Sequence, residues 1–272
     1  APATIPRYLL NGLTDEVGQS FVVVGYGASG HGSTGADASG VMQKRAARNR
    51  YEAPAEWLDA SLPGLVPDPT SPPPPAGAAL AYDFDSGMEQ NNTLAAWGFE
   101  SDLGWGDAEG GGAPGDSGSA EFIDGAIAGI LSGGLPAAAG ADFTDAIDAS
   151  WGEVTVSTRV SSFREFVLEA TDGTALFITA GDFNRDGRVE GGDFLAWQRG
   201  ESADALSGAE LADWLADFNA TPAFPTNSAT LEPATLASLL LCIGALAMVR
   251  LIRVLRSPQS GGGDGVTRRA SR

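Results

Sequence analysis

No stretch of the first 190 residues has the apolar spacing that a long amphipathic helix requires. The apolar residues gather instead in short runs bounded by glycine and other turn residues, which is the pattern of buried strands. Glycine (37 residues) and proline (16) favour turns, and a hydrophobic content of 43% allows a sizeable core. We therefore expect a mostly β fold. The predicted strands are residues 21–24, 79–84, 126–131 and 154–160, and residues 162–168 are predicted to form a short closing helix.

The charge of the chain argues against nucleic acid as a partner. The formal net charge is −19, so there is no basic surface to neutralise phosphates. Six of the 16 basic residues but only one of the 35 acidic residues follow residue 249. This asymmetry suggests an acidic body and a basic end on opposite sides of a membrane. The single cysteine, Cys242, and single histidine, His31, argue against an internal disulfide and against Cys- or His-rich metal sites.

A long apolar run near the C-terminus is the candidate for crossing that membrane. Residues 236–249 carry no charge and are apolar apart from Ser238, and residues 234–252, with Arg250 reaching back to the interface, would span about 28 Å as a helix. That length approaches the hydrocarbon core of a bilayer. The arginines that follow predict one membrane helix with its C-terminus in the cytoplasm. The alternative is a buried core helix.

The first motif that carries chemistry is Gly115-Asp116-Ser117-Gly118-Ser119. A serine attacks a carbonyl only when a base removes its proton and N–H groups stabilise the developing oxyanion. Glycine before the serine lets the backbone turn sharply, so that two N–H groups can point into one hole. The alternative is a chance acidic turn.

Four segments in order resemble the chymotrypsin/trypsin family of serine proteases. Residues 113–119 resemble the nucleophile loop of that family, and residues 128–134 resemble the strand beside its specificity pocket. Residues 158–167 are similar to its final strand and closing helix, and residues 23–27, with Gly25-Tyr26-Gly27, to an early strand of its second barrel. The resemblance covers about residues 1–168 and implies the second β-barrel of a two-barrel fold.

The resemblance implies a role for each matching residue. Ser117 would be the nucleophile, the N–H groups of Gly115 and Ser117 would form the oxyanion hole, and Asp116 would support the loop. Gly111 would stand at the base of the specificity pocket and would favour small or apolar side chains, although Asp107 and Glu109 lie close in sequence. The residues expected to pair with the substrate backbone are Ser132, Gly133 and Gly134.

The catalytic histidine and aspartate of the family have no match in this chain. In the family they belong to the first barrel, so we expect them upstream of Ala1. His31 is the one histidine present, and it is either a base, oriented by Asp83 or Asp85, or an exposed loop residue. The resemblance thus implies peptide-bond hydrolysis through an acyl-enzyme, with this chain as an incomplete part of the enzyme.

The second motif, residues 182–193, has the spacing of a calcium-binding loop. Oxygen-bearing side chains stand at loop positions 1, 3 and 5, glycine at position 6 and a carboxylate at position 12. The predicted ligands are Asp182, Asn184, Asp186, the carbonyl of Arg188, Glu190 and Asp193. Aspartate at position 12 resembles a dockerin repeat, which would imply a cohesin-like partner, but the second repeat is incomplete. The alternative is an Asp/Asn/Gly surface turn.

The segment Leu231-Glu232-Pro233-Ala234-Thr235, followed by the apolar run and arginines, resembles a PEP-CTERM sorting tail. This resemblance implies export to the cell envelope, at least transient membrane insertion and processing near Glu232 and Pro233.

The sequence predicts three parts: a protease-like barrel at 1–172, a dockerin-like calcium module with α-helices at 173–222, and a linker with sorting tail at 223–272. The leading hypothesis is an exported, envelope-associated serine endopeptidase that acts on polypeptides and binds calcium. The alternative is a non-catalytic, calcium-stabilised surface binding or adhesion module. A histidine and an aspartate in an upstream segment would decide for the first.

Overall fold

A computed structural model describes residues 7–37, 41–55, 77–144 and 146–218. The predicted membrane segment and the sorting residues Glu232 and Pro233 lie outside these residues, so these predictions stay open. Within the described ranges, no helix has the length and apolar character needed to cross a bilayer.

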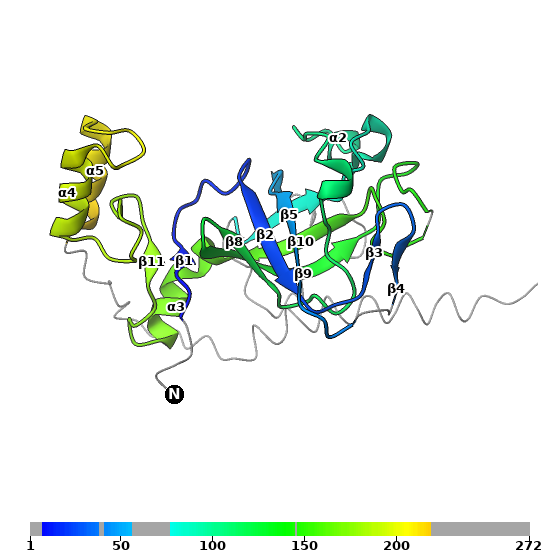
Figure 1. Cartoon of the computed structure of the whole chain (residues 1–272), viewed down its shortest axis with the longest axis horizontal. Helices are drawn as coiled ribbons and strands as arrows, with labels where there is room; N and C mark the ends of the chain where they lie inside the picture. The colour runs from blue at the N-terminus through cyan, green and yellow to red at the C-terminus, as the bar shows by residue number, and fades with distance from the viewer. Residues whose placement is uncertain (1–6, 38–40, 56–76, 145, 219–272) are drawn as a thin grey trace, which may run out of the picture. The chain divides into compact units, whose positions relative to one another are not determined.

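A nine-stranded sheet dominates the structure (Figure 1), which confirms the predicted mostly β fold. Along its main path each strand runs antiparallel to its neighbours. In spatial order the strands are β5 (Arg45–Arg50), β2 (Ser20–Gly25), β8 (Ala120–Ile123), β9 (Ala126–Leu135), β10 (Val154–Arg159), β7 (Ala79–Asp83) and β6 (Ala53–Pro54).

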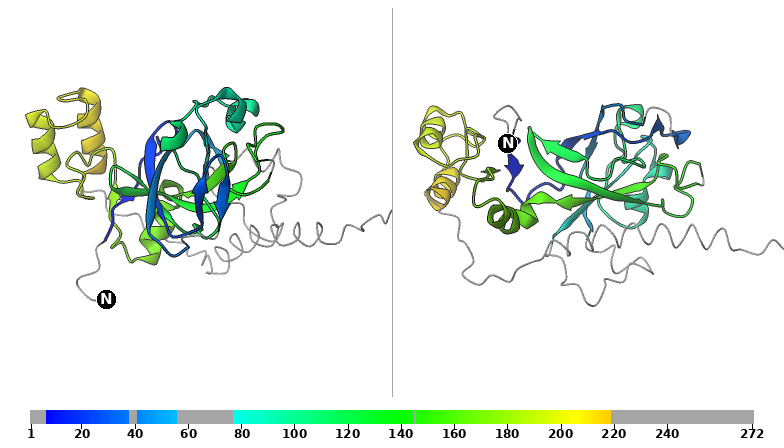
Figure 2. Two further views of the ribbon diagram at one scale, coloured as in Figure 1. Left: turned by 45° about the vertical axis from the view of Figure 1, so that its right-hand side comes forward. Right: turned by 90° about the horizontal axis from the view of Figure 1, so that it is seen from below.

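The two ends of this path are joined by the chain itself. Strands β5 and β6 are separated by only Tyr51 and Glu52, so one segment pairs with β2 at its start and with β7 at its end. The sheet therefore curls back on itself, as Figure 2 shows. A curled sheet of this kind encloses one face of every strand.

The enclosed face forms the main core. β2 alternates exposed and buried side chains, which places Phe21 and Val23 inside the curl. The ring of Phe21 stacks on Tyr51 with centroids 4.2 Å apart and meets Tyr82 edge to face. These aromatic residues pack with Leu80, Ile123, Ala128 and Leu131.

One carboxylate, that of Glu121, is buried within this core. It accepts hydrogen bonds from the hydroxyls of Tyr51 (2.6 Å), Tyr82 (2.8 Å) and Ser157 (2.7 Å). Burial raises the pKa of Glu121, although these three donors act in the opposite direction. A side chain at Gly129 would collide with the Tyr51 hydroxyl and the Glu121 carboxylate, so glycine there leaves room for the network.

Strand β1 (Leu10–Asn11) lies beside β9 and β11 (Phe177–Ile178) and pairs with both in parallel. The segment after β1 is held by Glu16, which is fully buried and forms an ion pair with Arg159 at the end of β10. The Glu16 carboxylate also accepts hydrogen bonds from Asn11 (3.1 Å) and Ser161 (2.7 Å). This network fastens the beginning of the chain to the end of the barrel.

The predicted strands and closing helix all correspond to observed elements. The closing helix consists of a 3₁₀ turn, η4 (Val160–Phe163), followed by α3 (Arg164–Ala170). The remaining elements are the hairpin β3 (Ser29–His31) and β4 (Gly35–Asp37), the short helices η2 (Glu89–Asn91), α2 (Thr93–Ala96) and η3 (Gly106–Ala108), and the helices α4 (Gly191–Arg199) and α5 (Gly208–Asp217). The described residues all fall in one compact unit, and the residues after the predicted boundary at 172 begin with a strand, β11, that joins the sheet.

Candidate active site

The loop at 113–119 makes two consecutive turns that expose its serine. The N–H of Asp116 donates to the carbonyl of Ala113 (3.0 Å), and the N–H of Ser119 donates to the carbonyl of Asp116 (2.9 Å). Gly115 has φ +96°, a backbone conformation that side chains rarely adopt. A Cβ at Gly115 would also stand 3.1 Å from Cα of Gly27, so both backbone conformation and space require glycine here.

These turns leave two N–H groups unused. The N–H groups of Gly115 and Ser117 donate to no acceptor within the described part of the chain, and the exposed Ser117 hydroxyl makes no hydrogen bond there. A pair of free N–H groups flanking a serine is what an oxyanion hole requires.

Asp116 anchors this loop to the barrel. Its carboxylate accepts hydrogen bonds from the N–H of Gly27 (2.7 Å) and from the N–H of Ala113 (3.2 Å). A Cβ at Gly27 would lie 2.7 Å from the Asp116 carboxylate, and one at Gly25 would collide with it. The Gly25-Tyr26-Gly27 triplet therefore makes room for the aspartate next to the nucleophile.

An unpaired strand edge adjoins the serine loop. Strand β8 pairs with β9 only as far as Ile130. At Leu131 the serine loop pairs with β9 in its place, because the N–H of Gly118 donates to the carbonyl of Leu131 at 2.8 Å. Beyond that point β9 pairs on its other side with β10, at Gly133 and Gly134, while Ser132 stands at a register shift. Within the described residues no strand covers the free edge of residues 132–134.

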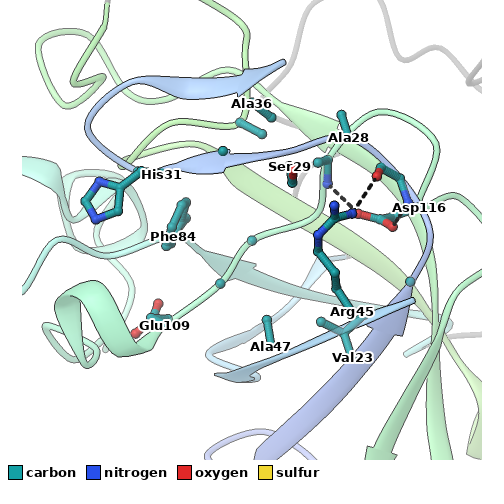
Figure 3. A pocket seen from close by; sticks show the side chains of 18 of the residues that line it. Val23, Ala28, Ser29, His31, Ala36, Arg45, Ala47, Phe84, Glu109 and Asp116 are labelled. Carbon is teal, nitrogen blue, oxygen red and sulfur yellow. Dashed lines mark hydrogen bonds between the residues drawn. The ribbon is translucent and has the colours of Figure 1, made fainter. Parts of the chain in front are cut away.

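A cleft of about 230 Å³ lies behind the loop, between β2, β5 and the β3–β4 hairpin. Asp116, Arg45 and Ala28 line it at one end, and Figure 3 shows His31 at the other. Gly111 also lines the cleft, where a Cβ would stand 3.1 Å from Cβ of Phe84. Ser117 is not among the residues that line this cleft.

His31 does not stand where a base for Ser117 would be needed. Its Nδ1 lies 2.8 Å from the Ser33 hydroxyl and its Nε2 lies 3.3 Å from the carboxylate of Asp107. The side chain is 53% exposed and has no contact with Ser117. Asp83 and Asp85, considered above as acids that orient His31, are buried elsewhere and make no bond to it. The structure therefore favours the exposed loop histidine.

Asp83 and Asp85 belong instead to a cluster that the sequence did not predict. We call Glu52, Asp83, Asp85, Asp102 and Glu109 the carboxylate cluster. Burial, reinforced by the neighbouring carboxylates, raises the pKa of Asp83 and of Asp85 far above the usual range. Burial likewise raises the pKa of Glu109 to about 7. The Asp-Phe-Asp sequence at 83–85, at the end of a strand, is the one local signal for this cluster.

The predicted calcium loop adopts a compact conformation around two buried aspartates. Asp182 accepts the N–H groups of Asp186 (3.1 Å) and Gly187 (2.8 Å), with Gly187 at φ +82°. Asp193, in the first turn of α4, accepts those of Asn184 (3.1 Å) and Glu190 (2.8 Å). Within the described residues, three carboxylates converge within 4.8 Å at Glu52, Asp85 and Asp102 and not in this loop.

Comparisons with known proteins find similarity to solved structures and not to sequences. No protein-family model and no curated protein matches the chain. Neuropsin, a serine protease expressed in the limbic system of mouse brain, is 15% identical with a TM-score of 0.39, over 62% of this chain and 55% of that one. HL collagenase is 14% identical with a TM-score of 0.32, over 58% and 48%.

Kallikrein-related peptidase 10 is also 14% identical, with a TM-score of 0.34, over 62% of this chain and 58% of that one. The chain thus spans about half the length of the solved chains it matches.

Proposed function

We propose that this chain carries the nucleophile and substrate-binding half of an exported, envelope-associated serine endopeptidase of the trypsin type. The observation that carries the proposal is the combination of an exposed Ser117, two free N–H groups beside it and an open strand edge next to the same loop. A polypeptide added as a further strand along residues 132–134 would bring its backbone to that loop.

The roles follow from this geometry. The Ser117 hydroxyl attacks the peptide carbonyl, and the N–H groups of Gly115 and Ser117 stabilise the resulting oxyanion. Loss of the amine leaves an acyl-enzyme, which water then hydrolyses. Asp116 keeps the loop in place through Gly27 and Ala113. Because His31 is turned toward Asp107, the proposal assigns the general base to the remainder of the full-length protein.

Labelling with a serine-directed fluorophosphonate tests the proposal. We expect the full-length protein to be modified at Ser117, found by mass spectrometry of its peptide, because only a serine with a base and an oxyanion hole reacts rapidly. Ser117→Ala should abolish labelling, whereas Ser119→Ala, on the same loop, should leave it unchanged. A folded full-length protein that takes up no label would favour the alternative, a non-catalytic surface module.

We also propose that residues 182–193 bind calcium. Support comes from an all-oxygen donor set and from Asp182, only 3% exposed, around which the loop is already wrapped. Ligands would be the side chains of Asp182, Asn184, Asp186 and Asp193, with Glu190 and the carbonyl of Arg188. Whether the module also engages a cohesin-like partner stays a prediction.

Calorimetry should show the loop taking up one calcium ion. Asp182→Ala and Asp186→Ala are each expected to lower the stoichiometry by one, because each removes a charged ligand from a site of few donors. Asp213→Ala, on the exposed side of α5, serves as the control and should bind like the parent. Identical heats in all four proteins would refute the site.

A further inference from the structure

The carboxylate cluster brings together acidic side chains from three separate segments. Glu52 follows β5, Asp83 is the last residue of β7 and Asp85 follows it, and Asp102 and Glu109 belong to the long connection that leads to the serine loop. One carboxylate oxygen from each of Glu52, Asp85 and Asp102 lies within 4.8 Å of the other two. Carboxylates so close together repel one another, and burial makes this repulsion stronger.

Asp85 stands out within the cluster, because it is 1% exposed and neither of its carboxylate oxygens has a hydrogen-bond partner. One oxygen of Asp83, which is also fully buried, lacks a partner as well. Native proteins rarely leave buried acceptors unpaired, and a bound ion is one of the usual reasons. One Asp85 oxygen lies within 4.8 Å of an oxygen of Glu52 and of an oxygen of Asp102, so an unpaired acceptor stands close to two other acceptors.

Positive charge from the protein does not balance the cluster. Arg50 forms an ion pair with Asp102 and is the one cationic side chain that contacts the cluster in the described residues. Backbone N–H groups satisfy further oxygens: Leu94 donates to Asp83 (2.8 Å), and Trp105 (2.7 Å) donates to Glu109. None of these donors reaches Asp85.

We propose that the cluster is a second, buried calcium site, with Asp85 as its central ligand and Glu52 and Asp102 beside it. Calcium binds oxygen donors at about 2.4 Å, so ligand oxygens up to about 4.8 Å apart can share one ion. The donors are all carboxylates, which suits a hard cation and disfavours zinc, for which histidine or cysteine would be expected.

The connection closes tightly over this site. Gly104 has φ +61°, and a side chain there would collide with the Glu109 carboxylate and crowd Asp85, where Cβ atoms would stand 2.6 Å apart. Asn49 then links the site to the segment just before the serine loop, since its side-chain amide donates to the carbonyls of Asp83 (2.9 Å) and Gly110 (3.2 Å). An ion held by Asp85 would therefore stiffen the segment that precedes Ser117.

The test uses the full-length protein with Asp182→Ala as background, so that the loop at 182–193 is disabled and the result does not depend on the proposed function. Calorimetry should show one remaining calcium ion per chain. Calcium at 100 times its Kd should raise Tm by about 5 °C or more over the EDTA-treated protein. Asp85→Asn is expected to abolish both effects, because it removes the charge of the central ligand and leaves the side-chain volume nearly unchanged.

Asp107→Asn, an exposed residue of the same connection, is the matched control and should retain both effects. If Asp85→Asn does not fold, Asp102→Asn, which is less buried, should lower calcium affinity at least tenfold. Two results would overturn the proposal. The first is that calcium does not change the Tm of the Asp182→Ala background protein. The second is that a folded Asp85→Asn or Asp102→Asn variant binds calcium as tightly as the background protein.

Discussion

Replacing Ser117 with alanine in the full-length protein is expected to lower kcat for peptide hydrolysis by about 10⁶-fold, the loss typical when a serine nucleophile is removed. The reason is that the acyl-enzyme route has no other nucleophile than this hydroxyl. The free backbone N–H groups at positions 115 and 117 would still bind the oxyanion of a water-attack pathway, so a small residual rate should survive. Hydrolysis of a peptide library, followed by mass spectrometry, measures both the rate and the cleavage site.

His31→Gln is the informative control for this experiment. Because His31 contacts Ser33 and Asp107, we expect its replacement to change kcat/KM less than threefold, a difference below about 1 kcal/mol. A loss as large as that of Ser117→Ala would mean that His31 is the base, and the assignment of the base to the remainder of the protein would be wrong.

Glu16→Ala is expected to destabilise the fold by about 3–5 kcal/mol, which is the cost of leaving one member of a buried ion pair without its partner. Arg159 is held by this fully buried carboxylate, and Asn11 and Ser161 donate to the same group. All three donors would lose their acceptor at once. Urea unfolding, followed by the fluorescence of the tryptophans, gives the change in the free energy of unfolding.

A double-mutant cycle with Arg159→Met separates the ion pair from the rest of the network. The double variant should be more stable than Glu16→Ala alone, because the uncompensated charge is gone. Glu165→Ala, an exposed acidic residue of α3, should stay within about 0.5 kcal/mol of the parent. If Glu16→Ala unfolded at the same urea concentration as the parent, the network would be dispensable.

Much of the barrel could be predicted because its central strands are short, apolar and bounded by turns. The run at 21–24 lies within β2, and the runs at 126–131 and 154–160 correspond to β9 and β10. Strand β5 was missed because it alternates arginines with small side chains and contains no large apolar residue. Its place is fixed by pairing with β2 and by burial of Asn49, neither of which a local pattern reveals.

The candidate active site was predictable to the extent that it lies within one loop. Gly115, Asp116 and Ser117 are adjacent in sequence, so their relative positions follow from local turns. The carboxylate cluster could not be predicted in this way, because its members lie up to 57 positions apart, from Glu52 to Glu109. They meet only when the sheet curls. The Asp-Phe-Asp sequence at 83–85 marks the end of a strand, but it does not indicate that both carboxylates are buried.

The joint between β5 and β6 makes the barrel intolerant of length changes at one place. Tyr51 bonds to Glu121 inside the curl, while its neighbour Glu52 accepts the hydroxyl of Ser101 (2.8 Å) on the outer side. Successive residues of an extended chain face opposite sides. Inserting or deleting a single residue before this pair would turn the ring outward and a carboxylate into the aromatic interior. A change in length at this position should therefore be tolerated less well than a substitution.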